Sequence, residues 1–383
     1  MQPLDERGNL LKEVFVAEIA AISAIGDSLE EMWLKLLEGG SATKEIERFP
    51  TDKLEFHKGA SIPWLDSFKG DNRVIELTRK LLGQIKNPPE ETYMIWAGIK
   101  GDTEYIEQKA KGEVKTSHYL ARHYRSFACQ KLGIRNNGID VNAACASSTV
   151  ALAMGAELIA SGQKSSVLIC CADILSRFSF TGFSALRGLS ATKCRPFDAQ
   201  RDGLVLGDGA AAILLTDEET AAANNYPLLG RLTGWGIAND ANHITGPARD
   251  ARGLIKAIKS AMDQSGISKE GIEAYCAHGT GTVYNDAMEL TGVESLYGSR
   301  KFPLFSVKGA IGHTLGAAGA IEAAISVKSL QENKVPPTAG FENHEERTIG
   351  RLSSSPQKFD GKSILTTNSG FGGCNAALIF EKV

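Results

Sequence analysis

Apolar and polar positions along the chain predict strands and helices that alternate in two successive runs. The first run predicts strands over 14–23, 92–99, 139–143, 165–173 and 209–217, and helices over 26–40, 117–133 and 145–162. The second predicts strands over 228–238, 272–279, 302–307, 362–368 and 375–383, and helices over 250–265, 285–297 and 313–331. Strands that alternate with helices form parallel sheets covered by helices, so we expect an α/β protein.

The repeated order predicts a duplication, with one half over 1–217 and a second over 218–383. The first half carries two insertions, a polar and irregular one at about 41–91 and another at 174–208. We expect the halves to pack face to face around two Gly/Ala-rich helices, since small residues allow close packing on two sides. Two unrelated α/β domains with the same order of elements are the alternative.

Charge and cysteine usage narrow the function classes. The chain has 42 Lys and Arg against 45 Asp and Glu, a formal net charge of −3, which argues against nucleic-acid or membrane-surface binding. An acidic partner would therefore need a local basic patch. No apolar run approaches the roughly 20 residues of a membrane span, and no signal-peptide pattern opens the chain, so we expect a cytoplasmic protein. The 7 cysteines show no CxxC spacing, and neither a disulfide framework nor a metal site is predicted.

Three residues at predicted strand ends carry the candidate chemistry. Cys145 lies at a strand-to-helix junction, where the amides and dipole of the first helical turn favour the thiolate. His278 follows the strand at 272–279, and His313 follows the strand at 302–307, five residues after Lys308. Carboxyl ends of strands are where α/β sheets place their sites, so we expect the three side chains to meet. Buried packing would be the simpler role for Cys145 alone, and structural hydrogen bonding for either histidine alone.

A thiolate and two imidazoles suit acyl transfer followed by carbon–carbon bond formation. The thiolate attacks a thioester, and an oxyanion hole stabilises the tetrahedral intermediate. Two imidazoles that aim Nε2–H at one thioester carbonyl would stabilise the enolate left when a malonyl group loses CO2. Hydrolysis competes with the condensation, so the site should exclude water.

The three candidate residues lie within or near longer stretches of characteristic sequence: AACASS, RPFDAQRDGLVLGDGAAAILL, AHGTGTVYND, VKGAIGHTLGAAGAIEA, VPPT and NSGFGG. In these motifs the sequence resembles the β-ketoacyl synthases of the thiolase superfamily, and among them the elongating type with a Cys-His-His triad. The resemblance covers nearly the whole chain. It implies a thiolase-like fold, a duplicated five-layered αβαβα sandwich. It also implies an acyltransferase that extends an acyl chain by two carbons from malonyl-acyl carrier protein.

The resemblance also implies a role for individual residues. Cys145 would accept the acyl group, and His278 and His313 would activate the malonyl unit. Lys308 would support the site through Glu322, and the backbone N–H groups of Phe371, the gating phenylalanine, and of Cys145 would form the oxyanion hole. The substrate side would comprise two threonines that bind the phosphopantetheine arm, an acyl-pocket residue and a basic residue facing the carrier: Thr280, Thr282, Phe183 and Arg187.

The same resemblance predicts the partners. They are acyl carrier protein, whose phosphopantetheine arm carries the substrate, and a second copy of the chain in a homodimer. A heterodimer with a second ketosynthase-like subunit stays open, and no permanently bound cofactor is expected. Three departures leave the acyl chain and the pathway, fatty acid, polyketide or polyene, undecided. The first turn reads AEIAAIS, the stretch before Cys145 is short, and NSGFGG lacks one residue of the family's gate motif.

Three other activities remain as alternatives. A thiolase-like enzyme that uses CoA would carry a second catalytic cysteine in place of one histidine, and both His278 and His313 are present. A non-elongating partner subunit of the chain-length-factor kind typically lacks the nucleophile, whereas Cys145 is present. A starter-unit enzyme of the Cys-His-Asn type is disfavoured by His313. Cys374 follows the gate motif and is more simply a packing residue than a second catalytic thiol.

Overall fold

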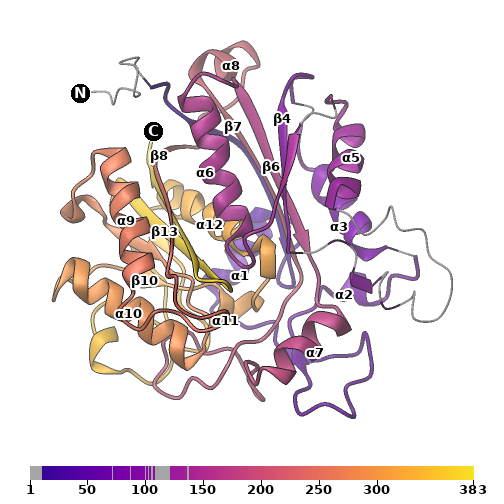
Figure 1. Ribbon diagram of the computed structural model, residues 1–383, viewed down its shortest axis with the longest axis vertical. Coiled ribbons are helices and arrows are strands. Elements are labelled where there is room, and N and C mark those ends of the chain that lie inside the picture. Colours follow the sequence, from indigo (N-terminus) through magenta and orange to yellow (C-terminus); the bar gives the residue numbers. More distant parts are fainter. Residues whose placement is uncertain are drawn as a thin grey trace.

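The computed structural model describes residues 11–70, 72–86, 88–99, 101, 103–104, 107, 121–135 and 138–383. Its centre is a sheet of ten strands in the order β10-β9-β13-β14-β8-β1-β7-β6-β4-β5 (Figure 1). The strands span β1 Phe15–Ser23, β4 Tyr93–Ala97, β5 Gly138–Val141, β6 Ser166–Asp173, β7 Gly209–Thr216, β8 Gly230–Asn239, β9 Ala274–Cys276, β10 Leu304–Phe305, β13 Ser363–Gly370 and β14 Cys374–Glu381.

The strand order contains the same five-stranded arrangement twice. In the first segment β5, β4 and β6 run parallel, and β7 and β1 follow antiparallel. The second segment, β10, β9, β13, β14 and β8, repeats this order and these directions. Among the described strands the segments join where β1 meets β8, through two residue pairs, so the two strand layers that the sequence predicts are linked into one hydrogen-bonded sheet. The boundary at 217/218 stays a prediction.

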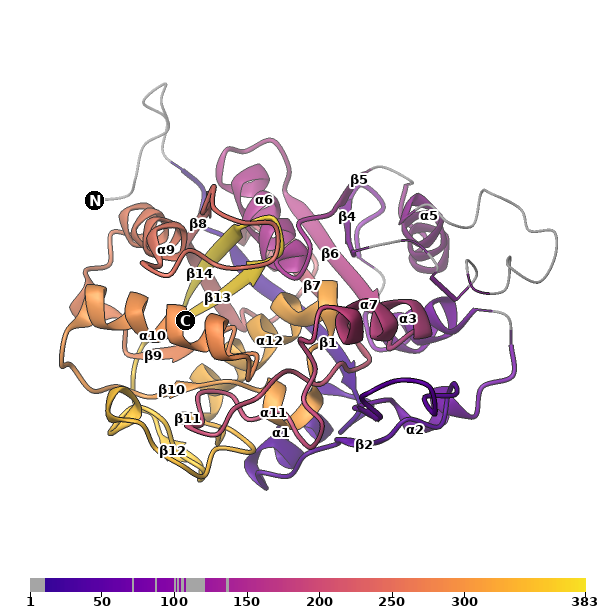
Figure 2. The ribbon, with the colours of Figure 1, turned by 60° about the horizontal axis from the view of Figure 1, so that its bottom comes forward.

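Two helices lie between the segments and two pairs cover the outer faces (Figures 1 and 2). The inner helices α6 (Ser147–Ala160) and α12 (Ala318–Glu332) contact each other and strands of both segments. The outer pairs are α3 (Arg73–Leu82) with α5 (Ala121–Leu132), and α9 (Arg252–Ser265) with α10 (Val283–Tyr297).

Alternation along each strand produces these layers, because neighbouring side chains point to opposite faces of a sheet. In β6, Ile169 and Cys171 join the apolar cluster around α6 and α12. Leu168 and Cys170 point the other way and join the cluster around α3 and α5. Both faces of the strand are buried, and the result is the expected helix–sheet–helix–sheet–helix order.

Small residues bring the two inner helices into close contact. A Cβ atom added to Gly319 of α12 would lie 1.9 Å from Oγ1 of Thr149 in α6. No other residue type fits at this position without moving one helix.

The remaining elements are short and mostly belong to the connections. Among the described residues they are α1 Leu29–Leu37, β2 Lys44–Glu45, β3 Lys58–Gly59, α2 Pro63–Asp66, α7 Arg177–Ala185, α8 Glu218–Ala223, α11 Lys308–Ile311, β11 Lys334–Val335 and β12 Gln357–Lys358. Three 3-10 turns cover Lys269–Gly271, Leu315–Ala317 and Glu346–Thr348. No helix of the described part is long and apolar enough to cross a bilayer.

The prediction that the insertion at about 41–91 is irregular is wrong where it forms the helices α2 and α3. Asn72 caps α3 by accepting the Ile75 N–H at 2.8 Å. Val74, Leu77 and Leu81 then recur at helical spacing and pack beneath the sheet. The predicted helix at 313–331 begins instead at Ala318, after a 3-10 turn, and the strand at 302–307 shrinks to β10. Residues 117–120 of the helix predicted over 117–133 lie outside the described residues.

Candidate active site

One cavity of about 440 Å³ collects most of the predicted site residues. Cys145, His278 and His313 line it, together with the two threonines, Phe183, Arg187 and Phe371. Lys308 and Glu322 lie behind His278, both almost fully buried. The expected meeting of strand ends is thus present, with the cysteine supplied by the first segment and both histidines by the second.

Cys145 sits in a tight turn that leads into α6. The preceding Ala144 has φ +50°, a left-handed conformation that L-residues rarely adopt. Ser147 stabilises this turn, since its Oγ accepts the Ala143 N–H at 2.9 Å and donates to the Ala144 carbonyl at 2.5 Å. The helix begins at Ser147 with Ala146 as its N-cap, so Cys145 precedes the first helical turn in which the sequence placed it.

The end of β13, at Gly370, packs against the backbone of Cys145. A Cβ atom on Gly370 would lie 2.6 Å from the Ala143 carbonyl oxygen and 3.2 Å from the Cys145 nitrogen. Glycine is therefore required for this close approach, which sets Phe371 beside the cysteine. The Phe371 ring is partly exposed and lies 5.6 Å from the Phe183 ring, measured between centroids.

Two hydrogen-bond donors fix the tautomer of His278. Its Nδ1 lies 3.2 Å from Lys308 Nζ and 2.9 Å from Asn368 Nδ2. The ammonium group has no acceptor capacity, and the Asn368 amide nitrogen also donates to the Glu322 carboxylate at 2.7 Å. Nδ1 is consequently the acceptor, and the proton of the neutral ring is on Nε2.

His313 has the same tautomer for a different reason. Its Nδ1 accepts the backbone N–H of Leu315 at 3.2 Å, which leaves Nε2 as the donor. Its own backbone is held on both sides by the segment before β7, through bonds to the Val205 carbonyl at 2.6 Å and from the Gly207 N–H at 3.0 Å. The two imidazole centroids are 5.3 Å apart, with the ring planes at 85°.

Both imidazoles are neutral at pH 7. Burial lowers the pKa of His278 well below its usual 6.5, and the charge on Lys308 and the neighbouring His313 lower it further. Burial followed by the Lys308 charge also lowers the pKa of His313. The site thus presents two uncharged Nε2–H donors beside a thiol, which is suited to stabilising a developing oxyanion without transferring a proton to it.

Lys308, Glu322 and Asn368 form a buried network under His278. Lys308 Nζ donates to the His278 carbonyl at 2.5 Å and pairs with Glu322. Thr149 of α6 donates to the Asn368 side-chain oxygen, which ties the network to the first segment. Asn368 was not predicted as a site residue, although it opens the NSGFGG motif; its position at the end of an apolar strand was the available signal.

Two further buried carboxyl groups, those of Glu289 and Asp286, shape the loop that follows His278. Glu289 accepts the backbone N–H groups of His278 at 2.8 Å and Gly279 at 2.7 Å. Asp286 accepts those of Thr280 at 3.0 Å and Gly281 at 3.1 Å. Burial, with the neighbouring Asp286, raises the pKa of Glu289 to about 7. Neither acid was identified from the sequence.

The remaining predicted residues lie around the cavity. Thr280 and Thr282 face each other with their hydroxyl oxygens 2.9 Å apart. Arg187 is exposed at the rim and has φ +52°. Within the described residues no group of three or more His, Cys, Asp or Glu could hold a metal ion.

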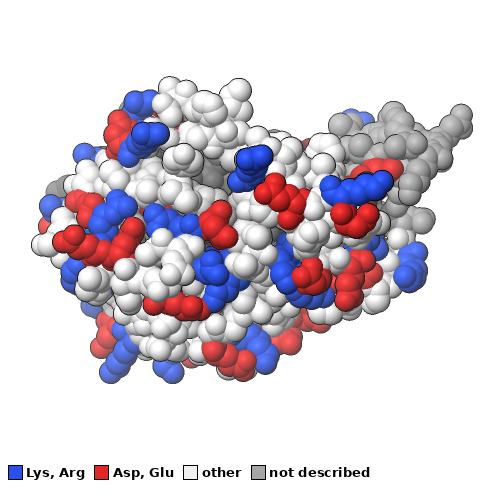
Figure 3. Space-filling model, turned by 90° about the horizontal axis from the view of Figure 1, so that it is seen from below, with Lys and Arg blue, Asp and Glu red and all other residues white. Residues whose placement is uncertain are grey.

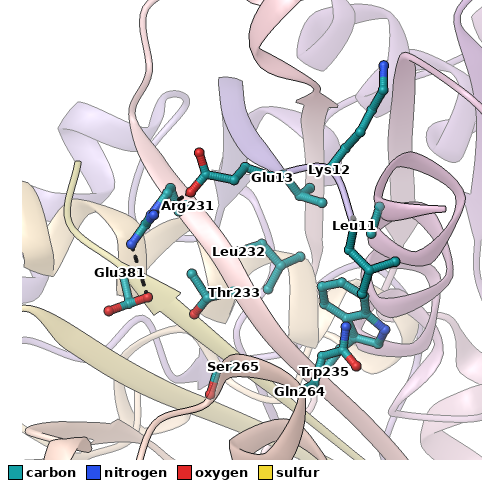
Figure 4. Close-up of a pocket in the computed structure, with 12 residues that line it drawn as sticks. Leu11, Lys12, Glu13, Arg231, Leu232, Thr233, Trp235, Gln264, Ser265 and Glu381 are labelled. Atoms are coloured by element: carbon teal, nitrogen blue, oxygen red, sulfur yellow. Dashed lines mark hydrogen bonds and ion pairs between the residues drawn. The ribbon is translucent and has the colours of Figure 1, made fainter. Parts of the chain in front are cut away.

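A smaller cavity of about 260 Å³ lies away from this site, between the start of β1, β8 and the end of α9 (Figure 4). Its described lining contains neither cysteine nor histidine. Arg231 there is paired with Glu13 at 2.5 Å and Glu381 at 3.3 Å, and Lys12 points away, toward Asp217 at 2.7 Å. Among its described lining residues this cavity therefore offers neither a thiol nor an imidazole.

Comparison with known proteins agrees with this geometry. Residues 90–221 match the family model of the N-terminal domain of β-ketoacyl synthases, and residues 229–342 match that of the C-terminal domain. The chain is 29% identical over 411 residues to the 3-oxoacyl-[acyl-carrier-protein] synthase 2 of Vibrio cholerae, and the alignment covers 97% of this chain and 99% of the relative. The corresponding enzyme of Synechocystis sp. is 28% identical over 410 residues, with 97% and 98% coverage.

Solved structures show the same fold. The ishigamide ketosynthase/chain length factor superposes with a TM-score of 0.89 at 25% identity, covering 97% of this chain and all of that one. A β-ketoacyl synthase from Burkholderia phymatum has a TM-score of 0.88 at 24% identity and the same coverage. The expected thiolase-like fold and condensing acyltransferase class are thereby confirmed. The chain belongs to the β-ketoacyl synthase family.

Proposed function

We propose that the protein is an elongating β-ketoacyl-acyl carrier protein synthase with Cys145 as nucleophile and His278 and His313 as the groups that activate the malonyl unit. The observation that carries this assignment is the pair of neutral imidazoles, both protonated at Nε2, that line one cavity with the cysteine. Relatives named as acyl-carrier-protein synthases support the carrier as substrate donor.

The first half-reaction loads the acyl chain. Cys145 Sγ attacks the carbonyl carbon of the acyl thioester, and the backbone N–H groups of Cys145 and Phe371 stabilise the oxyanion. The bond to the carrier sulfur breaks, and the carrier leaves as a thiol with the proton of the cysteine. The acyl chain passes Phe183, whose ring lies beside the Phe371 ring.

The second half-reaction forms the new carbon–carbon bond. The malonyl thioester loses CO2, and the electron pair of the broken bond becomes an enolate whose oxygen accepts both Nε2–H groups. The enolate carbon attacks the acyl-cysteine, and Cys145 leaves as a thiolate that takes up a proton. Lys308 and Glu322 act as positioning residues, since their contacts keep His278 Nδ1 an acceptor.

We assign the phosphopantetheine arm of the carrier to Thr280 and Thr282 and the carrier protein itself to the surface around Arg187. The arm is the only prosthetic group that the reaction requires, and it arrives with the substrate. Basic and acidic side chains alternate on the face of the molecule to which α7 contributes (Figure 3). Docking therefore depends on single cations such as Arg187 and not on a broad, positively charged surface.

We further propose that the chain acts as a dimer. Strand β5 ends the sheet, and an edge strand can pair with a second chain. A homodimer is the simplest form, while the ketosynthase/chain length factor relative supports a heterodimer as the other possibility. Light scattering of the purified chain distinguishes a self-associating protein from one that dimerises only when a second subunit is added.

Intact-protein mass spectrometry tests the proposed function. The protein incubated with an acyl-carrier thioester should gain one acyl mass, and Cys145→Ala should gain none. Cys374→Ala is the matched control, because Cys374 does not line the cavity, and it should be acylated normally. An acyl mass on Cys145→Ala, or no 3-oxoacyl product when malonyl-carrier protein is added to the acylated wild type, contradicts the proposal.

A further inference from the structure

A third imidazole, that of His243, lines the same cavity and has no part in the reaction described above. It lies in the loop between β8 and α9, which also contributes Thr245 and Gly246 to the cavity wall. Its side chain is exposed, unlike those of His278 and His313. His243 is therefore at the mouth of the cavity and not at its base.

The loop fixes which nitrogen of His243 can donate. Nδ1 accepts the backbone N–H groups of Thr245 and Gly246, both at 3.1 Å. A nitrogen that accepts two such bonds carries no proton, so the neutral ring has its hydrogen on Nε2. The ring thus offers one oriented donor away from the loop backbone.

The loop itself is held in place at both ends. Asp240 accepts the Ala248 N–H at 2.9 Å and the Asn375 side-chain nitrogen at 2.9 Å. The Gly372 N–H donates to the Ile244 carbonyl at 2.7 Å, which joins the loop to the turn that carries Phe371. An imidazole on such a loop is positioned before any substrate arrives, which lowers the entropic cost of binding.

We infer that His243 donates its Nε2–H to an acceptor oxygen in the outer half of the pantetheine arm, either a pantoyl oxygen or the phosphate. This inference rests on the proposed function, because it takes the arm as the substance that passes this mouth. The exposed side chains at the rim include the apolar Leu186 and Val283, which cannot bind an oxygen, and the donors Arg187 and Tyr284. His243 differs from these two donors because the loop backbone fixes which of its nitrogens donates. The inner half of the arm, next to the thioester, belongs to Thr280 and Thr282.

Two substitutions separate the donor from the shape of the loop. His243→Asn keeps a side-chain oxygen that can accept the two loop N–H groups but withdraws the donor from the cavity. His243→Ala removes both. Asn242→Ala is the matched control, since Asn242 is in the same loop but outside the cavity lining.

Self-acylation is measured with one acyl group on carrier protein, phosphopantetheine, pantetheine and N-acetylcysteamine. Both His243 variants should raise the apparent KM for the first two donors about threefold to tenfold, the effect of one hydrogen bond, with kcat unchanged. A KM defect that persists with pantetheine assigns the bond to the pantoyl group, and one that disappears assigns it to the phosphate. N-acetylcysteamine thioester should be used equally by all variants.

Three results would overturn the inference: an equal defect with N-acetylcysteamine, an Asn variant that behaves as wild type, or a defect of the same size in Asn242→Ala. Failure of the proposed function looks different. In that case the wild type itself is not acylated by any of the four donors.

Discussion

The two five-stranded segments have the same topology but contribute different chemistry. In both, a connection joins a short strand to an inner helix, and this connection carries Cys145 in the first segment and, after the short helix α11, His313 in the second. Two residues past the next strand inward, the second segment carries His278, whereas the first carries Ile99, which packs in an apolar cluster. Duplication thus supplies equivalent positions at one edge of the sheet. The first segment places the nucleophile there, and the second places the two oxyanion donors.

The largest expected effect comes from removing the donors of the second segment. His278→Ala and His313→Ala should each lower CO2 release from malonyl-carrier protein about 100-fold to 1000-fold, the usual cost of one oxyanion donor. Acylation of Cys145 should continue at least in part, because the thiol belongs to the other segment. Release of 14CO2 from labelled malonyl-carrier protein, beside the acyl mass, provides both readouts. Unimpaired CO2 release by either variant would refute the assigned role.

The buried lysine offers a pH test of the same donors. At pH 7 the imidazoles are neutral because their pKa values lie well below 6.5, and the decarboxylation rate falls only when acid protonates them. Lys308→Met removes a charge that lowers both pKa values, so the acidic limb of the profile should move to higher pH. The rate at pH 7 should also fall, about tenfold or more, because His278 loses a partner that fixes its tautomer.

Lys308→Met also leaves Glu322 buried without its cation. The double variant Lys308→Met/Glu322→Gln controls for that loss, and it should keep the upward shift of the acidic limb. A limb that stays at the wild-type pH in both variants would show that Lys308 does not set the protonation of the histidines.

The contact between the inner helices tests how far the segments depend on each other. Gly319→Ala should destabilise the protein by about 1–3 kcal/mol, because the added methyl group would overlap Thr149. The bond from Thr149 to Asn368 is disturbed as well, so decarboxylation should fall in the remaining folded protein. Gly182→Ala in α7 has no atom within 4 Å of the added carbon and should be at least as stable as the wild type, because alanine favours the helix over glycine. Equal denaturation midpoints for the two variants would refute the close contact.

The smallest expected effect lies at the rim of the cavity. Arg187→Glu should raise the KM for acyl-carrier protein several-fold, because it reverses a charge that meets the acidic partner. The KM for an N-acetylcysteamine thioester should stay the same. Added salt should raise the KM of the wild type for acyl-carrier protein and should change the KM of the variant less. An equal change with both substrates would show that Arg187 does not dock the carrier protein.

The sequence predicted the features that depend on local order. Each strand end that carries Cys145, His278 or His313 stands next to a readable apolar run, and the repeated order of elements gave the layered fold. The α3 helix was missed although its apolar residues recur at helical spacing, because charged residues separate them.

Contacts between distant segments could not be predicted in this way. Asn368 and His278 are 90 residues apart and meet only because β13 lies beside β9. Glu289 supports the His278 backbone from the next helix, and no local pattern marks a carboxylate that accepts two backbone N–H groups. The position of Cys145 before the helix, not within its first turn, also follows from the strained turn at Ala144.

The central claim is that loading and decarboxylation use side chains of different segments, and Cys145→Ala tests it most directly. CO2 release from malonyl-carrier protein should persist in this variant, while the acyl mass and the condensation product are absent. Thermal unfolding at the wild-type temperature would show that the fold is intact. Loss of CO2 release in a folded Cys145→Ala protein would contradict the division of roles between the two segments.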